Sequence, residues 1–169
     1  EPVNAATESA LVRNLSKELS TGLEARQKFI VFLRLCELLY RNSDSLSLEE
    51  QDFLRIVAAD FRIAAEEASA MIEICKKTPS HGGFSDKNAL LVHGHEKEVN
   101  APLPKMEVHD FQGMLLVVNL QRAGILLVRY SGTDRLFLNG QPVERDRAQM
   151  ITAGSVLRNT RGAAIYYSE

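Results

Sequence analysis

The sequence has no tryptophan, only two cysteines and almost no excess of either charge. Its 20 lysines and arginines balance 22 aspartates and glutamates, which argues against a nucleic-acid binder and against a polybasic membrane anchor. No apolar run reaches the roughly 18 residues expected of a membrane span, and no signal peptide is visible. Cys36 and Cys75 lack the spacing of a metal motif. We interpret them as free thiols of a reducing compartment rather than as a disulfide.

Motifs for catalysis are missing as well. There is no phosphate loop of the pattern G-x-x-x-x-G-K-[ST], and none of the four histidines stands in a nucleophile–base signature: His81, His93, His95 and His109. His93 and His95 could share a strand face and hold a metal with His109 or Glu96, but solvated histidines explain the pattern better. The sequence therefore predicts neither an enzyme nor a cofactor. A metal-dependent or hydrolytic enzyme that uses these histidines is the alternative.

The spacing of apolar residues changes along the chain. Hydrophobic residues make up 45% of the sequence, enough for a buried core. Their spacing is helical at first and alternating later, and the change falls in a stretch rich in glycine, serine and aspartate. We therefore predict an α+β protein. Its parts are a helical bundle over 1–79, a linker over 80–88 and an antiparallel β-sandwich over 89–169.

Individual elements follow from the same periodicities. Thr21 is the predicted cap of the second helix, and Ser47 with Glu50 forms a predicted capping box for the third. Asn139-Gly140 predicts a type I′ hairpin turn, which needs positive φ at both residues. Helices are predicted over about 10–19, 23–41, 48–61 and 64–77. Strands are predicted over 89–93, 106–110, 114–120, 124–130, 136–138, 141–143, 150–152, 155–157 and 164–167.

Two segments resemble known families. The stretch LYRNSDSLSLEEQDFLRIVAADFRIAAEE, within about 23–77, resembles the tellurite-resistance TerB-like helical domain, in which an acidic turn precedes an S/T-x-E-E helix start. The stretch SGTDRLFLNGQPVERDRAQMITAGSVLR resembles the end of a forkhead-associated domain, a family that binds phosphothreonine peptides. Ser131-Gly132-Thr133 stands where that family has Asn-Gly-Thr, and Phe137-Leu138-Asn139-Gly140 stands where it has Phe-Val-Asn-Gly.

The forkhead-like resemblance implies a phosphate site made of an arginine after a glycine and a Ser-x-x-His loop. Neither occurs here. We expect Arg129, the cation near the corresponding loop, to pair with an acid such as Asp134. A phosphopeptide-binding module with an unusual site remains an alternative. The residues left as candidates for contact with a ligand or partner are Arg129, Ser131, Thr133, Asn139 and Gly140.

The TerB-like resemblance also raises a cation site at Asp44, Glu49 and Glu50. A calcium loop spaces its oxygen ligands over about twelve positions around a glycine, and this turn is shorter and has no glycine. Acidic residues in the first turn of a helix are explained by the helix dipole. The sequence favours that explanation and leaves cation binding open.

Taken together, both halves and the order RY-x-G, LFLNG, AGSVLRN and IYYSE resemble the N-terminal region of a bacterial ABC transporter ATP-binding protein. The chain starts without methionine and stops inside a β pattern, which we also interpret as a piece of a longer protein. The resemblance implies a non-catalytic regulatory or protein-interaction region in the cytoplasm, brought to the inner membrane face by its parent. Its expected partners are the parent's ATPase and membrane domains and a further protein, with no nucleic acid and no membrane insertion of its own.

Overall fold

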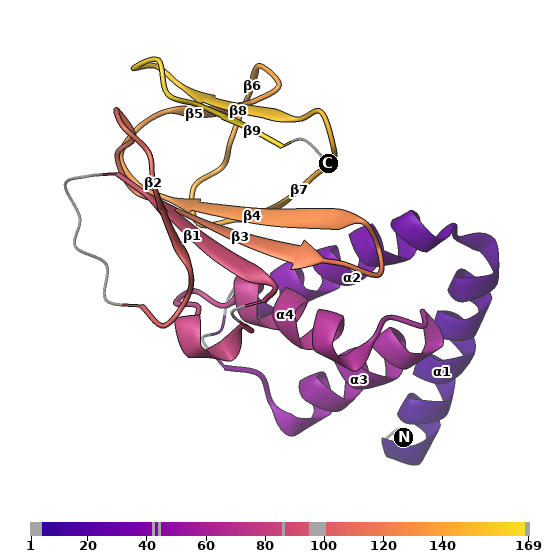
Figure 1. The fold of residues 1–169 in the computed structure, drawn as a ribbon. Coiled ribbons are helices and arrows are strands. Elements are labelled where there is room, and N and C mark those ends of the chain that lie inside the picture. Colours follow the sequence, from indigo (N-terminus) through magenta and orange to yellow (C-terminus); the bar gives the residue numbers. More distant parts are fainter. Residues whose placement is uncertain (1–4, 42, 44, 86, 95–100, 168–169) are drawn as a thin grey trace. The chain divides into compact units, whose positions relative to one another are not determined.

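The computed structural model describes residues 5–41, 43, 45–85, 87–94 and 101–167. Backbone contacts divide the chain into two compact units, Glu1–Thr78 and Pro79–Glu169. Four helices come first and β-sheets follow (Figure 1), which confirms the predicted α+β class and the order of helices before strands. None of the helices in the described residues has both the length and the apolar character needed to cross a membrane.

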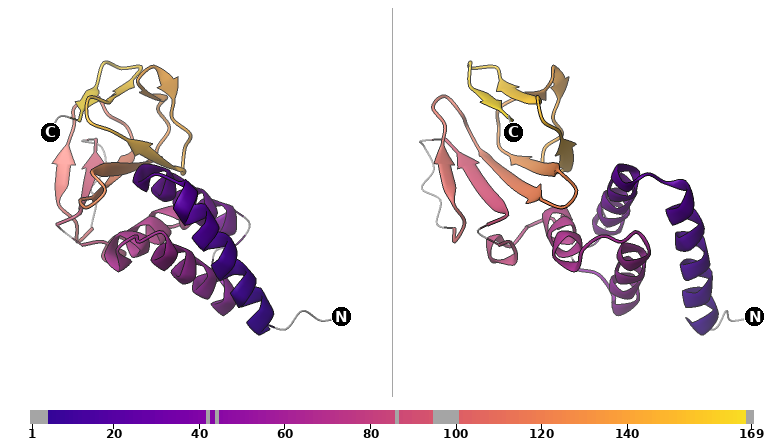
Figure 2. Two further views of the ribbon diagram at one scale, coloured as in Figure 1. Left: turned by 90° about the vertical axis from the view of Figure 1, so that its right-hand side faces the viewer. Right: turned by 45° about the vertical axis from the view of Figure 1, so that its right-hand side comes forward.

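The helical unit contains α1 (Ala5–Gly22), α2 (Ala25–Tyr40), α3 (Leu48–Asp60) and α4 (Ala65–Cys75). Helix α2 packs on α3 and α4, and α1 lies beside α3 (Figure 2). Two serines tie α1 to the end of α3: Ser20 Oγ donates to the backbone oxygen of Asp60 at 2.8 Å, and Ser16 Oγ donates to the Asp60 carboxylate. The stripe of leucines on α1 is more than half exposed: Leu11, Leu15 and Leu19.

The starts of two helices test the predicted caps. Thr21 lies inside α1, where its hydroxyl donates to the backbone oxygen of Glu18 at 2.7 Å. The predicted cap at Thr21 is therefore wrong, because α1 continues through Gly22. Helix α2 begins after Glu24, whose backbone N–H donates to Gln27 Oε1 at 2.8 Å. The reciprocal hydrogen bonds of the Glu24–Gln27 capping box satisfy backbone donors in the first turn of α2, as a serine or threonine cap would.

The β unit contains two sheets, and Figure 1 shows one stacked over the other. All nine predicted strands are present, with ends displaced by at most three residues. The five-stranded sheet has the order β2-β1-β3-β4-β7, from β1 (Ala89–His93), β2 (Lys105–Glu107), β3 (Met114–Leu120), β4 (Ile125–Ser131) and β7 (Ala148–Ile151). The four-stranded sheet has the order β6-β5-β8-β9, from β5 (Leu136–Leu138), β6 (Gln141–Pro142), β8 (Val156–Asn159) and β9 (Ala164–Tyr166).

One strand pair departs from an antiparallel arrangement. β1 and β2 run parallel, with Leu91 opposite Lys105 and His93 opposite Glu107. Parallel neighbours need a longer connection than a hairpin turn, and residues 94–104 separate β1 from β2 in the sequence. The stretch predicted as a linker also has structure of its own, because His81–Gly83 forms a short 3-10 helix.

The core of the β unit lies between its two sheets. Leu115, Val128 and Tyr130 of the five-stranded sheet meet Leu136 and Leu157 of the four-stranded sheet there, all 3% exposed or less. Successive side chains of a strand point to opposite faces, so the neighbours of Leu115 and Val128 lie on the other face of the same sheet. Most residues of β3 and β4 on that face are also apolar and buried: Leu116, Val118, Leu120, Ile125 and Leu127. Arg129 on the same face is buried but charged, and Met114 and Ser131 are half-buried.

Candidate functional site

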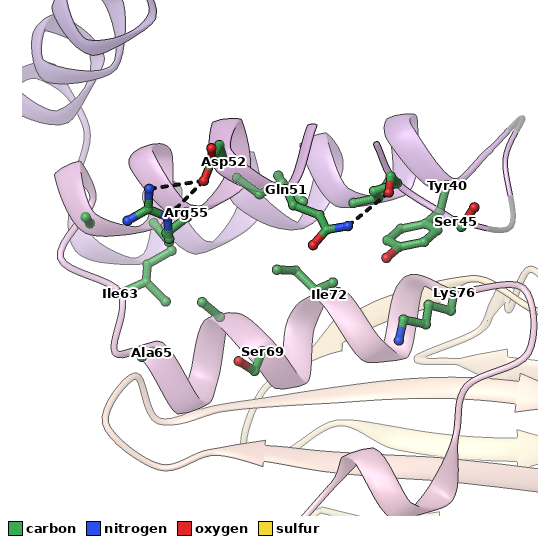
Figure 3. Close-up of a pocket in the computed structure, with 15 residues that line it drawn as sticks. Tyr40, Ser45, Gln51, Asp52, Arg55, Ile63, Ala65, Ser69, Ile72 and Lys76 are labelled. Atoms are coloured by element: carbon green, nitrogen blue, oxygen red, sulfur yellow. Dashed lines mark hydrogen bonds and ion pairs between the residues drawn. The ribbon is translucent and has the colours of Figure 1, made fainter. Parts of the chain in front are cut away.

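A groove of about 770 Å³ runs between α3 and α4 and is the candidate binding site of the helical unit. Figure 3 shows the two helices on either side of it, with Tyr40 and Lys76 at one end and Ile63 and Ala65 at the other. Ligand sites in proteins commonly have volumes of about 300–1,000 Å³. We call this feature the interhelical groove.

The floor and walls of the interhelical groove are mostly apolar. Leu54 and Ile63 are buried at its base, and Ile72 is half-buried on α4. Small residues occupy the facing turns of both helices, which keeps the walls low and lets another chain approach the helix backbones. They are Ala58 and Ala59 on α3, and Ala65, Ala68 and Ser69 on α4.

One end of the interhelical groove is polar. Lys76 Nζ donates to Glu73 Oε2 at 2.5 Å, and this hydrogen bond raises the pKa of the Lys76 ammonium. Burial raises the pKa of the Tyr40 hydroxyl, while the positive charge of Lys76 acts in the opposite direction. At neutral pH this end therefore presents a hydroxyl donor beside an ammonium donor, which suits a ligand group with acceptor oxygens.

Charged and polar side chains also lie along the α3 rim. Arg55 Nη2 is 3.0 Å from Asp52 Oδ1, and both side chains are largely exposed, so this ion pair contributes little to stability. Gln51 Nε2 donates to the backbone oxygen of Leu46 at 2.9 Å and fixes the turn before α3 (Figure 3). We did not predict this site from the sequence. A signal for it exists in the alanine and serine residues that recur on two consecutive helices.

The sequence-predicted contact residues lie in the β unit. Arg129 sits in β4 opposite Leu116 of β3 and Ala148 of β7, and it is 4% exposed. Its side chain points to the sheet face opposite Tyr130, away from the core between the sheets. Asp134 forms its ion pair with Arg161 instead, with Nε 3.4 Å from Oδ1. Asp134 therefore pairs with Arg161, and the predicted ion pair between Arg129 and Asp134 does not form.

Ser131 and Thr133 are both held against the loop before β7. Ser131 Oγ donates to Asp146 Oδ1 at 2.6 Å, and the backbone oxygen of Thr133 accepts a hydrogen bond from Arg145 Nη2 at 2.7 Å. These contacts join residues 131–133 to residues 145–146. Both candidates therefore take part in fixing two loops of the sandwich to each other.

Asn139-Gly140 forms the predicted hairpin turn between β5 and β6, with φ of 50° and 86°. The Asn139 side-chain oxygen accepts the N–H of Val156 at 2.9 Å, and its own N–H donates to the Val156 oxygen at 2.9 Å. The turn is thus bonded to β8. Within the described part of the chain, Asn139 forms no hydrogen bond with Ser131 or Thr133.

A buried polar group joins the two sheets and was not identified from sequence. Asn159 Nδ2 donates to the Asp110 backbone oxygen at 2.6 Å and lies 3.3 Å from Asp134 Oδ2. Asn159 Oδ1 accepts the N–H groups of Arg161 at 3.0 Å and Ala163 at 2.8 Å. Asp134 Oδ2 also accepts the N–H of Gln112 at 3.2 Å. We call Asp110, Gln112, Asp134, Asn159 and Arg161 the junction cluster, and its satisfied hydrogen bonds indicate a structural role.

Helix capping accounts for Glu50 at the start of α3. Glu50 N–H donates to Ser47 Oγ at 3.2 Å and Ser47 N–H donates to Glu50 Oε2 at 2.8 Å, which confirms the capping box. Hydrogen bonds from its own backbone N–H and from the Ser47 hydroxyl lower the pKa of Glu49. Asp44 lies outside the described residues.

The remaining ligand-type side chains are scattered in the described part of the chain. His93 Nδ1 is 3.0 Å from the backbone oxygen of Gly94, and His109 is exposed. His95 and Glu96, which the metal hypothesis also needs, lie outside the described residues. No cluster of three or more histidine, cysteine, aspartate or glutamate side chains suited to a metal occurs among the residues described. Neither cysteine forms a disulfide, as predicted.

Comparisons of this chain with models of protein families, with curated proteins and with solved structures found no significant match.

Proposed function

We propose that this chain is a non-catalytic regulatory and protein-interaction region of a larger cytoplasmic ABC transporter ATP-binding protein. In this proposal the helical unit is TerB-like, the β unit is forkhead-associated-like, and the interhelical groove binds a short amphipathic helix of a partner protein. The sequence resemblance supports the parent protein, and the order of a helical unit before a β unit is compatible with it. The interhelical groove is the observation that carries the binding role.

A helix suits the interhelical groove better than a compact ligand does. The groove lies between two helices and combines an apolar floor with alanine and serine walls, so a third helix can lie close to both (Figure 3). An amphipathic helix presents apolar side chains at i, i+3 or i+4, and i+7, which together form a single stripe. Such a stripe would cover Ile72 and the exposed surfaces of Ala59 and Ala65 while its polar face stays in water.

The polar end of the interhelical groove gives the helix a preferred direction. A carboxylate near that end could accept hydrogen bonds from the Tyr40 hydroxyl and the Lys76 ammonium. At the opposite end, near Ile63 and Ala65, the cation that lines the groove is Arg55, whose guanidinium is paired with Asp52 at 3.0 Å (Figure 3). The partner is therefore a segment with an apolar stripe and an acidic residue at the end that meets Lys76.

A fluorescent helical peptide of about 18 residues, with leucines in one stripe and a glutamate at one end, should bind the chain with a dissociation constant in the micromolar range. Ser69→Trp fills the interhelical groove from an exposed position and should weaken binding at least about tenfold, or roughly 1.4 kcal/mol. Fluorescence anisotropy measures both constants.

The control for bulk is Glu66→Trp, because Glu66 is exposed on the same helix but does not line the groove. It should leave the dissociation constant unchanged. A scrambled peptide of the same composition should bind at least about tenfold more weakly. Equal binding of the scrambled peptide, or normal binding by the Ser69→Trp variant, would show that the interhelical groove is not the binding surface.

Deletion of the helical unit from the parent protein tests the regulatory role. We expect the parent without residues 1–79 to be expressed and to bind nucleotide, with a changed basal ATPase rate or a changed set of co-purifying proteins. Contacts can alter a two-state ATPase only when they differ between its states, so Ser69→Trp alone should reproduce the change if the groove carries it. Unchanged turnover together with unchanged partners would contradict the regulatory proposal.

A further inference from the structure

The outer face of the four-stranded sheet combines an arginine with aromatic side chains. Leu136, Leu157 and Ile165 point into the core between the sheets. Their neighbours along the strands therefore point to the opposite face. We call this set the outer face: Phe137 on β5, Val156 and Arg158 on β8, and Ala164 and Tyr166 on β9. Tyr166 is 64% exposed and Arg158 is exposed as well.

Strand β9 is one edge of this sheet. The N–H of Asn159 donates to the oxygen of Ala163 at 3.1 Å, and the N–H of Tyr167 donates to the oxygen of Ser155 at 3.0 Å. The backbone groups of Ala163 and Tyr167 thus face β8. Alternate residues of an antiparallel strand face opposite sides, so Ala164 and Tyr166 direct their N–H and C=O groups to the open edge.

Arg158 lies one strand away from that open edge. Its partner across β8 and β9 is Ala164, so only a methyl group stands on the outer face between the arginine and the edge. Its partner on the other side is Phe137 of β5. Arg158 forms no ion pair within the described part of the chain, and no acidic residue belongs to the outer face. The guanidinium is therefore available to an acidic group carried by a strand added at β9.

We propose that the β9 edge binds an extended segment of a partner protein as an additional strand, with an acidic side chain of that segment paired to Arg158. Backbone hydrogen bonds to Ala164 and Tyr166 supply the attachment, and the arginine selects the sequence. Tyrosine and arginine are the side chains that most often dominate protein interfaces, and Tyr166 and Arg158 lie on one face here. This surface belongs to the β unit and does not depend on the interhelical groove.

The test uses the labelled peptide Thr-Val-Thr-Glu-Thr-Val-Thr, whose alternation places both valines and the glutamate on one face. It should bind the full chain with a dissociation constant of tens to hundreds of micromolar, a range expected for a short added strand. The same peptide with lysine at its centre should bind at least about tenfold more weakly. A version with N-methyl groups on alternate amides, which cannot pair with β9, should not bind.

Two variants separate charge from backbone pairing. Arg158→Glu should reverse the preference, so that the lysine peptide binds more tightly, whereas Arg41→Glu on the surface of the helical unit should leave the preference unchanged. Tyr166→Pro removes an N–H from the open edge without removing a bond to β8, and should weaken the glutamate peptide at least about tenfold. Circular dichroism checks that the variants are folded. No binding of the glutamate peptide at about 1 mM, equal binding of the lysine or N-methyl peptide, or an unreversed preference in Arg158→Glu would overturn the proposal.

Discussion

Asn159→Asp is expected to lower the free energy of unfolding of the β unit by about 3–5 kcal/mol at neutral pH. The substitution keeps the size of the side chain but replaces its N–H donors by an acceptor. The new carboxylate would face the Asp110 backbone oxygen, 2.6 Å from the present amide nitrogen, and Asp134 Oδ2 at 3.3 Å. Since Asn159 is 8% exposed, the new negative charge would be buried, and the Asp110 backbone oxygen and Asp134 Oδ2 would repel it.

The pH dependence of this loss gives a second readout. Burial and the neighbouring Asp134 should raise the pKa of the introduced carboxylate in the folded protein above its unfolded value. Its protonated form is then favoured by folding, so the loss should be largest above the folded pKa and should shrink as the pH falls through it. Chemical denaturation of the variant and the natural chain at pH 8 and pH 5, followed by hydrogen exchange of the β8 amides, measures the difference.

The adjacent Thr160→Ala is the control, because Thr160 is exposed and should change stability by no more than about 0.5 kcal/mol. Asn159→Ala should be intermediate, since it removes the hydrogen bonds without adding a charge. The structural role of the junction cluster would be contradicted by a loss below about 1 kcal/mol in Asn159→Asp, or by a loss that stays the same at both pH values.

Gly94→Ala should destabilise the β unit by about 3 kcal/mol or more. A Cβ atom on Gly94 would overlap the backbone oxygen of Phe111 and lie 2.8 Å from its carbonyl carbon. Because these are backbone atoms, they cannot rotate away as a flexible side chain would. The end of β1 would have to separate from the segment that carries Phe111, a core residue whose ring lies 5.8 Å from the ring of Tyr130.

Gly82→Ala provides the matched control. The nearest atom to an added Cβ there is Ser80 Oγ at 3.8 Å, an ordinary contact. Its effect should be within about 0.5 kcal/mol of zero, or slightly stabilising, because alanine loses less chain entropy on folding than glycine. Denaturant unfolding monitored by circular dichroism compares the two variants. A Gly94→Ala variant as stable as Gly82→Ala would mean that the two backbone segments do not meet as described.

Most of the secondary structure could be predicted because each element carries its own periodicity. The hairpin at Asn139-Gly140 and the capping box at Ser47 depend on local backbone geometry that a few residues determine. The cap at Thr21 failed for a related reason. The glycine that follows it is tolerated in the last turn of α1, so the helix end had no clear local marker.

Features that depend on how distant elements meet could not be predicted. A three-residue strand such as β2 carries no sequence pattern that distinguishes parallel from antiparallel pairing. Strand β4 is buried on both faces, so its nearly continuous apolar sequence does not show which face of the sheet each residue meets. The sequence therefore did not reveal that the Arg129 side chain points away from the core between the sheets and does not pair with Asp134. The junction cluster gathers residues far apart in sequence, and the interhelical groove depends on how α3 packs on α4.

The arginine beside the β9 edge also bears on whether the chain stays monomeric in concentrated solution. An open edge can pair with the same edge of another copy, which is a common route to aggregation. Such pairing would bring the outer faces of two copies together and place two Arg158 side chains on one surface, both positively charged. The same charge that would attract an acidic strand therefore repels a second copy. The chain should stay monomeric at higher protein concentrations when the ionic strength is low, because salt then screens this repulsion least.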